Sequence, residues 1–197
     1  MIVHTICEAA NGPGEDRAIY YDRSTSETVV LADGAGGIGG GGEAAEMVVG
    51  AFDRWSTSDP SVAALVELDR ALAQEETCGE TTCVAFRHQD GKIIGASVGD
   101  SAGYVLFDNG IVELTENQYQ KPLLGSGSAI PVGFSHAVSA GRVLVCSDGL
   151  WKYASYQSMI ETAKMRDASE VPQRLIDMVR LTSGGLQDDV SIVLCEL

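Results

Sequence analysis

The order of strand-like and helix-like segments constrains the fold of this chain more than any other feature. Short apolar runs rich in β-branched residues predict strands at 2–7, 17–22, 27–33, 81–86, 92–100, 102–107, 135–140, 142–148 and 189–197. Apolar residues spaced three and four apart predict helices over 43–56, 61–75, 155–165 and 170–182. Helices thus interrupt a series of strands in two places, unlike the strict alternation of a parallel sheet. This order predicts an α+β fold, an antiparallel sandwich with helices packed outside.

Turn and cap residues agree with this arrangement. Asp90-Gly91 and Asn109-Gly110 separate neighbouring strand-like runs, and such dipeptides favour tight antiparallel hairpins. The last helix is expected to begin after a Ser169 cap, to carry Pro172 in its first turn and to stop at Gly184-Gly185.

Composition limits the choice of function. The chain has 197 residues, of which 45% are hydrophobic, so one domain with a substantial core is expected. Its net charge of −15 would repel the phosphates of a nucleic acid, which argues against a nucleic-acid partner. The sequence has no apolar run long enough for a membrane span and no signal-peptide pattern, so we expect no membrane partner and a cytoplasmic location.

The cysteines and serines do not indicate a nucleophilic or zinc site. The five cysteines are scattered and mostly lie in apolar runs, which is typical of reduced thiols. Cys78 and Cys83 lack a second pair at zinc-binding spacing. Ser101 and Ser147 lie beside acids but outside a G-x-S-x-G motif, and Cys146 lacks the phosphate loop of a cysteine phosphatase.

Acidic residues recur at the tips of the predicted strands. Asp33, Asp100 and Asp148 each end an apolar run, whereas Asp188-Asp189 opens the last one. Since the end of one antiparallel strand lies beside the start of the next, Asp188 is expected near Asp33 or Asp148 at one rim of a sheet. One Asp-Gly after a strand is commonly only a turn, but several carboxylates on one rim repel each other unless a cation lies between them. Oxygen ligands without histidine predict Mg²⁺ or Mn²⁺.

The glycine-rich segment at 34–39, GAGGIG, allows a competing hypothesis. It matches the G-x-G-x-x-G pattern of dinucleotide sites, and Asp53 follows about 20 residues later. Asp33 would, however, direct a carboxylate at the pyrophosphate, and Asp53 falls on a helical stripe instead of ending a second strand. A nucleotide site is therefore the less favoured hypothesis, and Gly39 to Gly42 are expected to form a hinge beside the acids.

Six motifs occur in register along nearly the whole chain. They are GEDR (14–17), ADGAGG (32–37), GETTCVAF (79–86), VGDSAGY (98–104), VLVCSDGLW (143–151) and QDDVSIVL (187–194). Together they resemble the PPM, or protein phosphatase 2C, family of metal-dependent serine/threonine phosphatases, in its compact bacterial form. The resemblance implies a four-layer α-β-β-α sandwich, two antiparallel sheets flanked by helix pairs. It also implies a single catalytic domain over 1–197, with no room for a large flap subdomain.

The resemblance implies a set of metal ligands. Asp33 would bridge two Mg²⁺ or Mn²⁺ ions, and the backbone carbonyl of Gly34 would coordinate one of them. Asp148 and Asp188 would hold the other ion. Asp189 stands where the family often has Asn, so Asp188 is the predicted ligand of the acidic pair.

The same resemblance implies an activity. Glu15 and Asp16 would orient metal-bound water, and Asp100 occupies the position linked with a third, weaker ion. The implied reaction is hydrolysis of phosphoserine or phosphothreonine esters in proteins by a metal-bridged hydroxide, without a phospho-enzyme. The implied partner is a phosphoprotein substrate, and the enzyme would oppose a serine/threonine kinase.

Two departures from the family pattern bear on this activity. Asn11 stands where the family usually has an arginine that grips the substrate phosphate, and the nearby Arg17 is read as an exposed strand residue. Lys152 stands where relatives often bear an acid that helps to hold the third ion. Either that ion is missing or Lys152 itself approaches the phosphate. These departures keep open a second hypothesis, a phosphatase-like binding or regulatory module with weakened activity.

Overall fold

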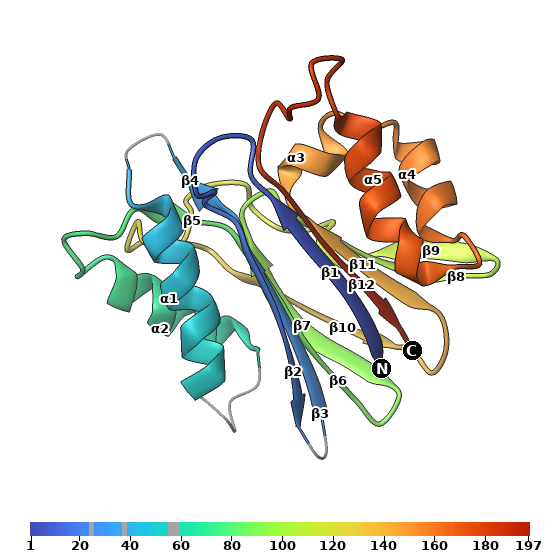
Figure 1. Ribbon diagram of the computed structural model, residues 1–197. Coiled ribbons are helices and arrows are strands. Elements are labelled where there is room, and N and C mark those ends of the chain that lie inside the picture. The colour runs from blue at the N-terminus through green and yellow to red at the C-terminus, as the bar shows by residue number, and fades with distance from the viewer. Residues whose placement is uncertain (24–25, 37–38, 55–59) are drawn as a thin grey trace.

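Two antiparallel sheets pack face to face between two groups of helices (Figure 1). The computed structural model describes residues 1–23, 26–36, 39–54 and 60–197. In spatial order the first sheet consists of β1 (Ile2–Glu8), β12 (Val190–Glu196), β11 (Arg142–Cys146), β8 (Ala102–Phe107) and β9 (Gly110–Glu113). The second consists of β10 (Val132–Ala137), β7 (Lys92–Val98), β6 (Cys83–Gln89), β3 (Ser26–Ala32) and β2 (Arg17–Arg23). A separate two-stranded ribbon pairs β4 (Gly34–Ala35) with β5 (Glu80–Thr81).

Each sheet carries helices on its outer face. The helices α1 (Gly41–Arg54) and α2 (Val62–Leu72) pack on the second sheet. The first sheet carries α3 (Asp148–Trp151), α4 (Tyr156–Ala163), η1 (Ala168–Glu170) and α5 (Val171–Val179). The predicted four-layer sandwich is therefore confirmed. Among the described helices, none is long and apolar enough to cross a membrane.

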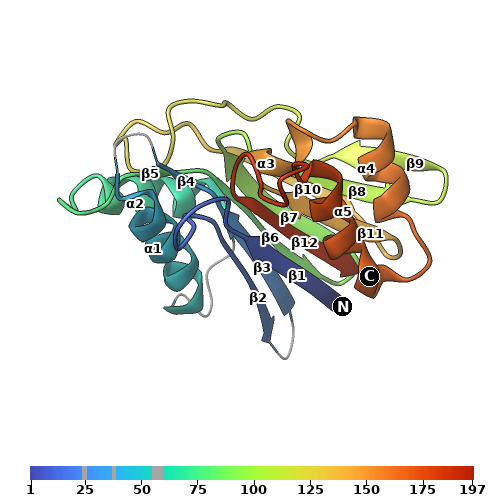
Figure 2. The ribbon, with the colours of Figure 1, turned by 45° about the horizontal axis from the view of Figure 1, so that its top comes forward.

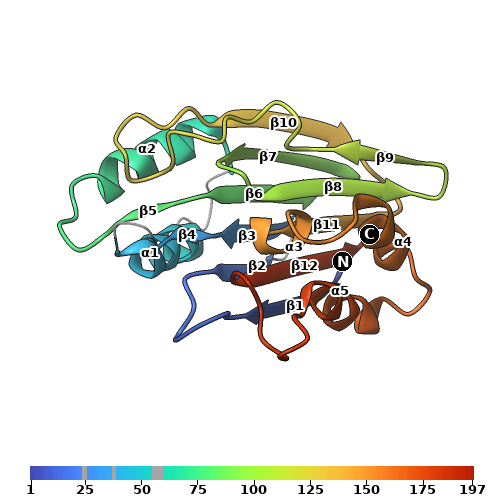
Figure 3. The ribbon, with the colours of Figure 1, turned by 90° about the horizontal axis from the view of Figure 1, so that it is seen from above.

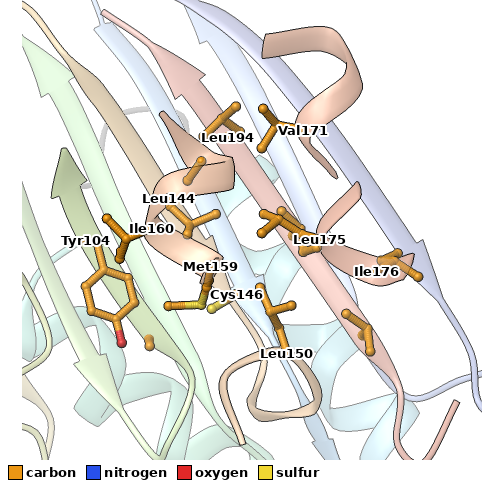
Figure 4. Packing of buried hydrophobic residues seen from close by; sticks show 14 of the residues in the cluster. Tyr104, Leu144, Cys146, Leu150, Met159, Ile160, Val171, Leu175, Ile176 and Leu194 are labelled. Carbon is orange, nitrogen blue, oxygen red and sulfur yellow. The ribbon is translucent and has the colours of Figure 1, made fainter. Parts of the chain in front are cut away.

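Strict alternation of side chains divides the apolar strands between two layers of the core. On β11, Leu144 and Cys146 point toward the helices and lie close to Met159 of α4 (Figure 4), whereas Val143 and Val145 point between the sheets. Successive residues of a strand face opposite sides of the sheet. Because both sides are covered, these strands are continuously apolar, which is why they stand out in the sequence.

The predicted element boundaries are right for the long elements and wrong for several ends. The Asp90-Gly91 turn joins β6 to β7 as predicted, with positive φ at both residues. The last helix ends at Val179, well before Gly184-Gly185, and Asp167 caps the turn that leads into it where Ser169 was expected. Pro172 does lie in the first turn of α5. The ribbon β4–β5, strand β9 and helix α3 were not predicted, since two to four residues show no periodicity. Trp55 of the predicted 43–56 stripe, with Gly37 and Ile38 of the glycine-rich segment, lies outside the described residues.

A buried acid ties helix α2 to a loop near the ribbon β4–β5. Asp69 lies on the buried face of α2 and is only 3% exposed. Its carboxylate accepts hydrogen bonds from the backbone N–H groups of Gly125 (2.9 Å), Gly127 (3.0 Å) and Ala129 (3.1 Å). The residue before this loop, Leu124, exchanges two backbone hydrogen bonds with Thr81 of β5. Asp69 therefore holds the loop that supports β5.

Substitution of Asp69 tests this anchoring role. Asp69→Ala should lower the free energy of unfolding by about 2–4 kcal/mol, because three backbone N–H groups lose a charged acceptor. Urea denaturation measures the change. Glu67→Ala, an exposed position on the same helix, is the control and should change stability by less than about 0.5 kcal/mol. Equal effects at the two positions would contradict the role given to Asp69.

Candidate metal centre

The predicted acids gather at one end of the sandwich, where loops from both sheets meet. Asp33 directly follows β3 of the second sheet, while Asp148 follows β11 and Asp188 precedes β12 in the first sheet. The connection between β1 and β2 runs beside the segment that leads into β12 (Figure 2). A cavity of about 420 Å³ at this end is lined by Asn11, Glu15, Asp16, Asp33, Gly34, Asp188 and Asp189, among others. Seen from above, the end of β3 lies near helix α3, although β3 is part of the second sheet and α3 packs on the first (Figure 3).

Two threonines fix the backbone of Asp33. The N–H of Asp33 donates to the hydroxyl of Thr82 (3.1 Å), and its carbonyl accepts from the N–H of Thr82 (2.8 Å) and from the hydroxyl of Thr81 (2.8 Å). Both threonines are buried. No role was predicted for them from the sequence, although two polar residues at the start of an apolar strand are a usable signal.

A pair of buried serines fixes the other sheet at the same end. The hydroxyl of Ser147 accepts from the N–H of Ser191 (2.9 Å), and the N–H of Ser147 donates to the carbonyl of Ser191 (3.0 Å). This pair joins the ends of β11 and β12 and so holds Asp148 near Asp188. Asp148 is the first residue of α3, whereas the sequence predicted it as the end of a strand.

The two acids just before β12, Asp188 and Asp189, make different contacts. Asp189 accepts hydrogen bonds from the backbone N–H groups of Ala10 (2.8 Å) and Glu15 (2.6 Å), so it anchors the β1–β2 connection. Asp188 accepts one hydrogen bond from the N–H of Asp189 (3.0 Å). Because the carboxylate of Asp189 is committed to the backbone, Asp188 is the acid of the pair that is available to bind a cation.

The electrostatics of this end show carboxylates crowded together. Burial, followed by the charges of Asp16, Asp148 and Asp100, raises the pKa of Asp33 far above its ordinary value. Burial, followed by the charge of Asp148, also raises the pKa of Asp188. A divalent cation among these groups would relieve the repulsion, and carboxylate and carbonyl oxygens are ligands that Mg²⁺ and Mn²⁺ prefer.

Asp16 gives a second sign that this end suits a cation. Both of its carboxylate oxygens are buried, and within the described part of the chain neither has a hydrogen-bond partner. Burial is the largest cause of the raised pKa of Asp16, and the nearby hydroxyls of Ser147 and Ser191 offset part of it. The residues present therefore fit a divalent ion by chemistry. As they stand, no group of three or more His, Cys, Asp or Glu side chains among the described residues has the spacing of a metal site.

Glycines allow three backbone segments to meet beside Asp33. Gly40 has a positive φ of 77°, and a Cβ added there would lie 2.5 Å from the backbone nitrogen of Gly79. A Cβ on Gly41 would lie 2.8 Å from the backbone nitrogen of Ala35. The N–H of Gly79 also donates to the carbonyl of Gly40 (2.8 Å). These two glycines have a packing role, where the sequence analysis expected a hinge.

Arg17 lies away from the acid-lined cavity. Its guanidinium donates to Glu46 (2.8 Å) and to the carbonyls of Gly14 (3.1 Å) and Asp16 (2.8 Å). It lines a neighbouring cavity of about 590 Å³ with Met47 and other residues. Arg17 thus braces the β1–β2 connection and does not line the acid-lined cavity that contains Asn11.

Two consecutive residues at the end of helix α3, Trp151 and Lys152, hold Asp100 in place. The indole N–H of Trp151 donates to the backbone carbonyl of Asp100 (2.8 Å), and the ammonium of Lys152 pairs with its carboxylate (3.0 Å). The same ammonium pairs with the carboxylate of Asp148. Lys152 therefore joins two of the predicted metal-binding acids.

Comparisons with known proteins agree with this architecture. No family model matches the chain. It is 26% identical, over 207 aligned residues, to the serine/threonine protein phosphatase PstP of Mycobacterium tuberculosis, an alignment that covers 86% of this chain and 40% of PstP. A bacterial serine phosphatase of known structure matches with a TM-score of 0.84 at 17% identity, covering 100% of this chain and 97% of that one. The chain has the protein phosphatase 2C fold.

The resemblance to the PPM phosphatases that rests on the sequence motifs is thereby confirmed. The crystal structure of the PstP catalytic domain in complex with two manganese ions matches with a TM-score of 0.82 at 23% identity, covering 99% of this chain and 97% of that domain. The chain spans only about 40% of the length of the curated relatives it matches.

Neighbouring glycines provide a matched test of the packing beside Asp33. Gly41→Ala should destabilise the protein by about 1–3 kcal/mol, because the new methyl group meets backbone atoms that have no room to move. Gly42→Ala should be tolerated, since its Cβ would lie at an ordinary 3.7 Å from the nearest atom. Thermal unfolding of the two variants measures the difference. Equal melting temperatures would show that the close approach at Gly41 is unimportant.

Proposed function

We propose that this chain is a metal-dependent protein phosphatase that hydrolyses phosphoserine or phosphothreonine esters. The observation that carries the proposal is the gathering of Asp33, Asp148 and Asp188 at one end of two sheets. The pKa values of Asp33 and Asp188 are raised, and among the described residues no lysine or arginine forms an ion pair with either acid. The sequence and fold likeness to PstP supports it.

The proposed cofactors are two Mg²⁺ or Mn²⁺ ions. When bound, such a pair lowers the pKa of a water held between the ions and polarises the oxygens of a phosphate ester. Asp33 would bridge the ions, the carbonyl of Gly34 would add a ligand to one, and Asp148 and Asp188 would hold the other. Hydrogen bonds already fix the backbone of Asp33 and the strand ends beside Asp148 and Asp188, so only the carboxylates would have to turn inward to meet the ions.

The remaining acids of the cavity would position the attacking water. Asp16 is buried against Asp33 with both oxygens unpaired among the described residues, so it can accept a proton from a water beside it. Glu15 lines the same cavity, and its backbone is fixed by Asp189. Attack by water would be direct, because Ser101 and Ser147, the serines next to Asp100 and Asp148 in the sequence, are buried in structural hydrogen bonds.

The comparison with PstP supports a proposal for the substrate class. A phosphoprotein is the proposed substrate, and a serine/threonine kinase would supply it. We also propose that residues 1–197 act as one catalytic domain without a large flap subdomain. The segment from 114 to 131, which joins β9 to β10, holds neither a named strand nor a helix.

The dinucleotide hypothesis receives no support from the glycine-rich segment. A Cβ on Gly36 would lie 2.2 Å from a carboxylate oxygen of Glu15, so an acid covers the loop where a pyrophosphate would approach. Gly40 and Gly41 pack against backbone and leave no cradle at their positions.

Substitution of Asp33 separates a metal centre from a structural acid. Because the pKa of Asp33 is raised, the metal-free protein loses stability as pH rises above the ordinary aspartate value of about 4. Asp33→Asn should therefore raise the metal-free free energy of unfolding at pH 8 by about 1 kcal/mol or more, since each pKa unit is worth about 1.4 kcal/mol. The variant should also lose the Mn²⁺-induced rise in Tm and at least about 100-fold in kcat/KM.

The assay for this variant uses p-nitrophenyl phosphate and a phosphothreonine peptide, with Mn²⁺ or with EDTA. Asp108→Asn, in the exposed turn after β8, is the control and should retain wild-type behaviour. Turnover that survives EDTA or the loss of Asp33 would contradict the proposal. Manganese binding without turnover on either ester would favour the binding-module hypothesis.

Asn11 lines the acid-lined cavity and can be used to restore phosphate binding. Asn11→Arg should lower KM for the phosphothreonine peptide about tenfold, because a guanidinium forms charge-assisted hydrogen bonds with a phosphate. Steady-state kinetics in Mn²⁺ measures the change. Asn109→Arg, in the exposed turn between β8 and β9, adds the same charge elsewhere and should leave KM unchanged. An unchanged KM for Asn11→Arg would dismiss the idea that this position governs phosphate affinity.

A further inference from the structure

One lysine lies within the acidic end of the sandwich. The ammonium of Lys152 pairs with Oδ2 of Asp100 at 3.0 Å and with Oδ2 of Asp148. The two carboxylates come from different strand ends, Asp100 after β7 and Asp148 after β11. A single cation therefore already bridges two acids that stand beside the candidate metal centre.

The position of this lysine is fixed by its surroundings. Its backbone N–H donates to the carbonyl of Asp148 (3.0 Å), which closes helix α3. Its ammonium also lies 5.7 Å from the centre of the Trp151 ring, at the distance of a cation–π contact. Since Trp151 donates to the carbonyl of Asp100, one short segment holds both the backbone and the carboxylate of that acid.

The acid that receives the ammonium is also held in place. Ser101, the next residue, shares a hydrogen bond of 2.7 Å with the hydroxyl of Thr82, and its carbonyl accepts from the side chain of Gln118 (2.7 Å). Thr82 in turn binds the backbone of Asp33. These hydrogen bonds fix the position of Asp100 relative to Asp33. They therefore also fix the position of the Lys152 ammonium that pairs with Asp100.

We propose that Lys152 is a built-in third cation, which limits the centre to two divalent ions. The proposal rests on the proposed function, because it assumes that Asp33, Asp148 and Asp188 bind the two ions. Two carboxylates that share one cation have the ligands and charge to hold a divalent ion. A third ion at that place would have to displace the ammonium from both acids and would be repelled by it. A carboxylate has two oxygens, so Asp148 can accept from Lys152 with one and bind an ion with the other.

The experiment counts the ions. Manganese bound per chain is measured by the electron paramagnetic resonance signal of free Mn²⁺ during titration of wild type, Lys152→Gln and Lys152→Asp. Wild type should bind two ions. Lys152→Gln removes the ammonium and Lys152→Asp adds a ligand, so both should bind a third ion. The third ion should bind to Lys152→Asp at least about 100-fold more tightly than any third ion binds to wild type.

The control is Lys164→Gln, an exposed lysine directly after helix α4, which should keep two ions. Circular dichroism confirms that each variant is folded, and Lys152→Gln carries the test if Lys152→Asp does not fold. Three ions in wild type, or two in both folded Lys152 variants, would overturn the inference and leave the proposed function standing. If the Lys152 variants bind two ions and have a higher KM for the phosphothreonine peptide than wild type, the inference would be overturned and Lys152 would instead contact the phosphate directly. Wild type that binds no Mn²⁺ would overturn the proposed function itself.

Discussion

Repulsion among partly buried carboxylates is the constraint on which the rest of this structure depends. Asp33, Asp16 and Asp188 have raised pKa values, and burial is the first cause in each case. A fold that only had to be stable would move these charges into solvent. Instead, two complete sheets with their helices bring the acids to one end. In the proposed metal centre, bound cations would relieve this repulsion, so the free energy that the arrangement costs would favour cation binding.

The structure meets this constraint by fixing backbones and leaving carboxylates available. Thr81 and Thr82 hold the backbone of Asp33, and the pair Ser147 and Ser191 holds the strand ends beside Asp148 and Asp188. The carboxylate of Asp189 accepts two backbone hydrogen bonds from the β1–β2 connection. The acids can then turn toward an ion without any movement of the sheets. Preorganisation of this kind lowers the conformational cost of binding.

How much was predictable from the sequence depends on the length of each feature. The longer strands and the four longer helices were predicted because their apolar patterns extend over many residues, and the acids were noticed because each adjoins such a run. Helix α3 and the ribbon β4–β5 are too short to show a period, so Asp148 was placed at a strand end. The preference for Asp188 over Asp189 came from family likeness and stays a prediction, which the two backbone hydrogen bonds accepted by Asp189 favour. The role of Asp69 could not be predicted, because an acid within an amphipathic helix is most often a surface residue.

The anchoring of Asp69 has a consequence for how the molecule fails. A chain of hydrogen bonds runs from Asp69 through the loop at 125–129 and Leu124 to Thr81, and from Thr81 to the carbonyl of Asp33. This chain of hydrogen bonds thus links helix α2 to the candidate metal centre. Heat or denaturant that loosens α2 would weaken one support of Asp33, the hydrogen bond from Thr81, while the two sheets still hold together. The candidate metal centre would then loosen before the sandwich unfolds, so that loss of the geometry around Asp33 and global unfolding would be two separate events.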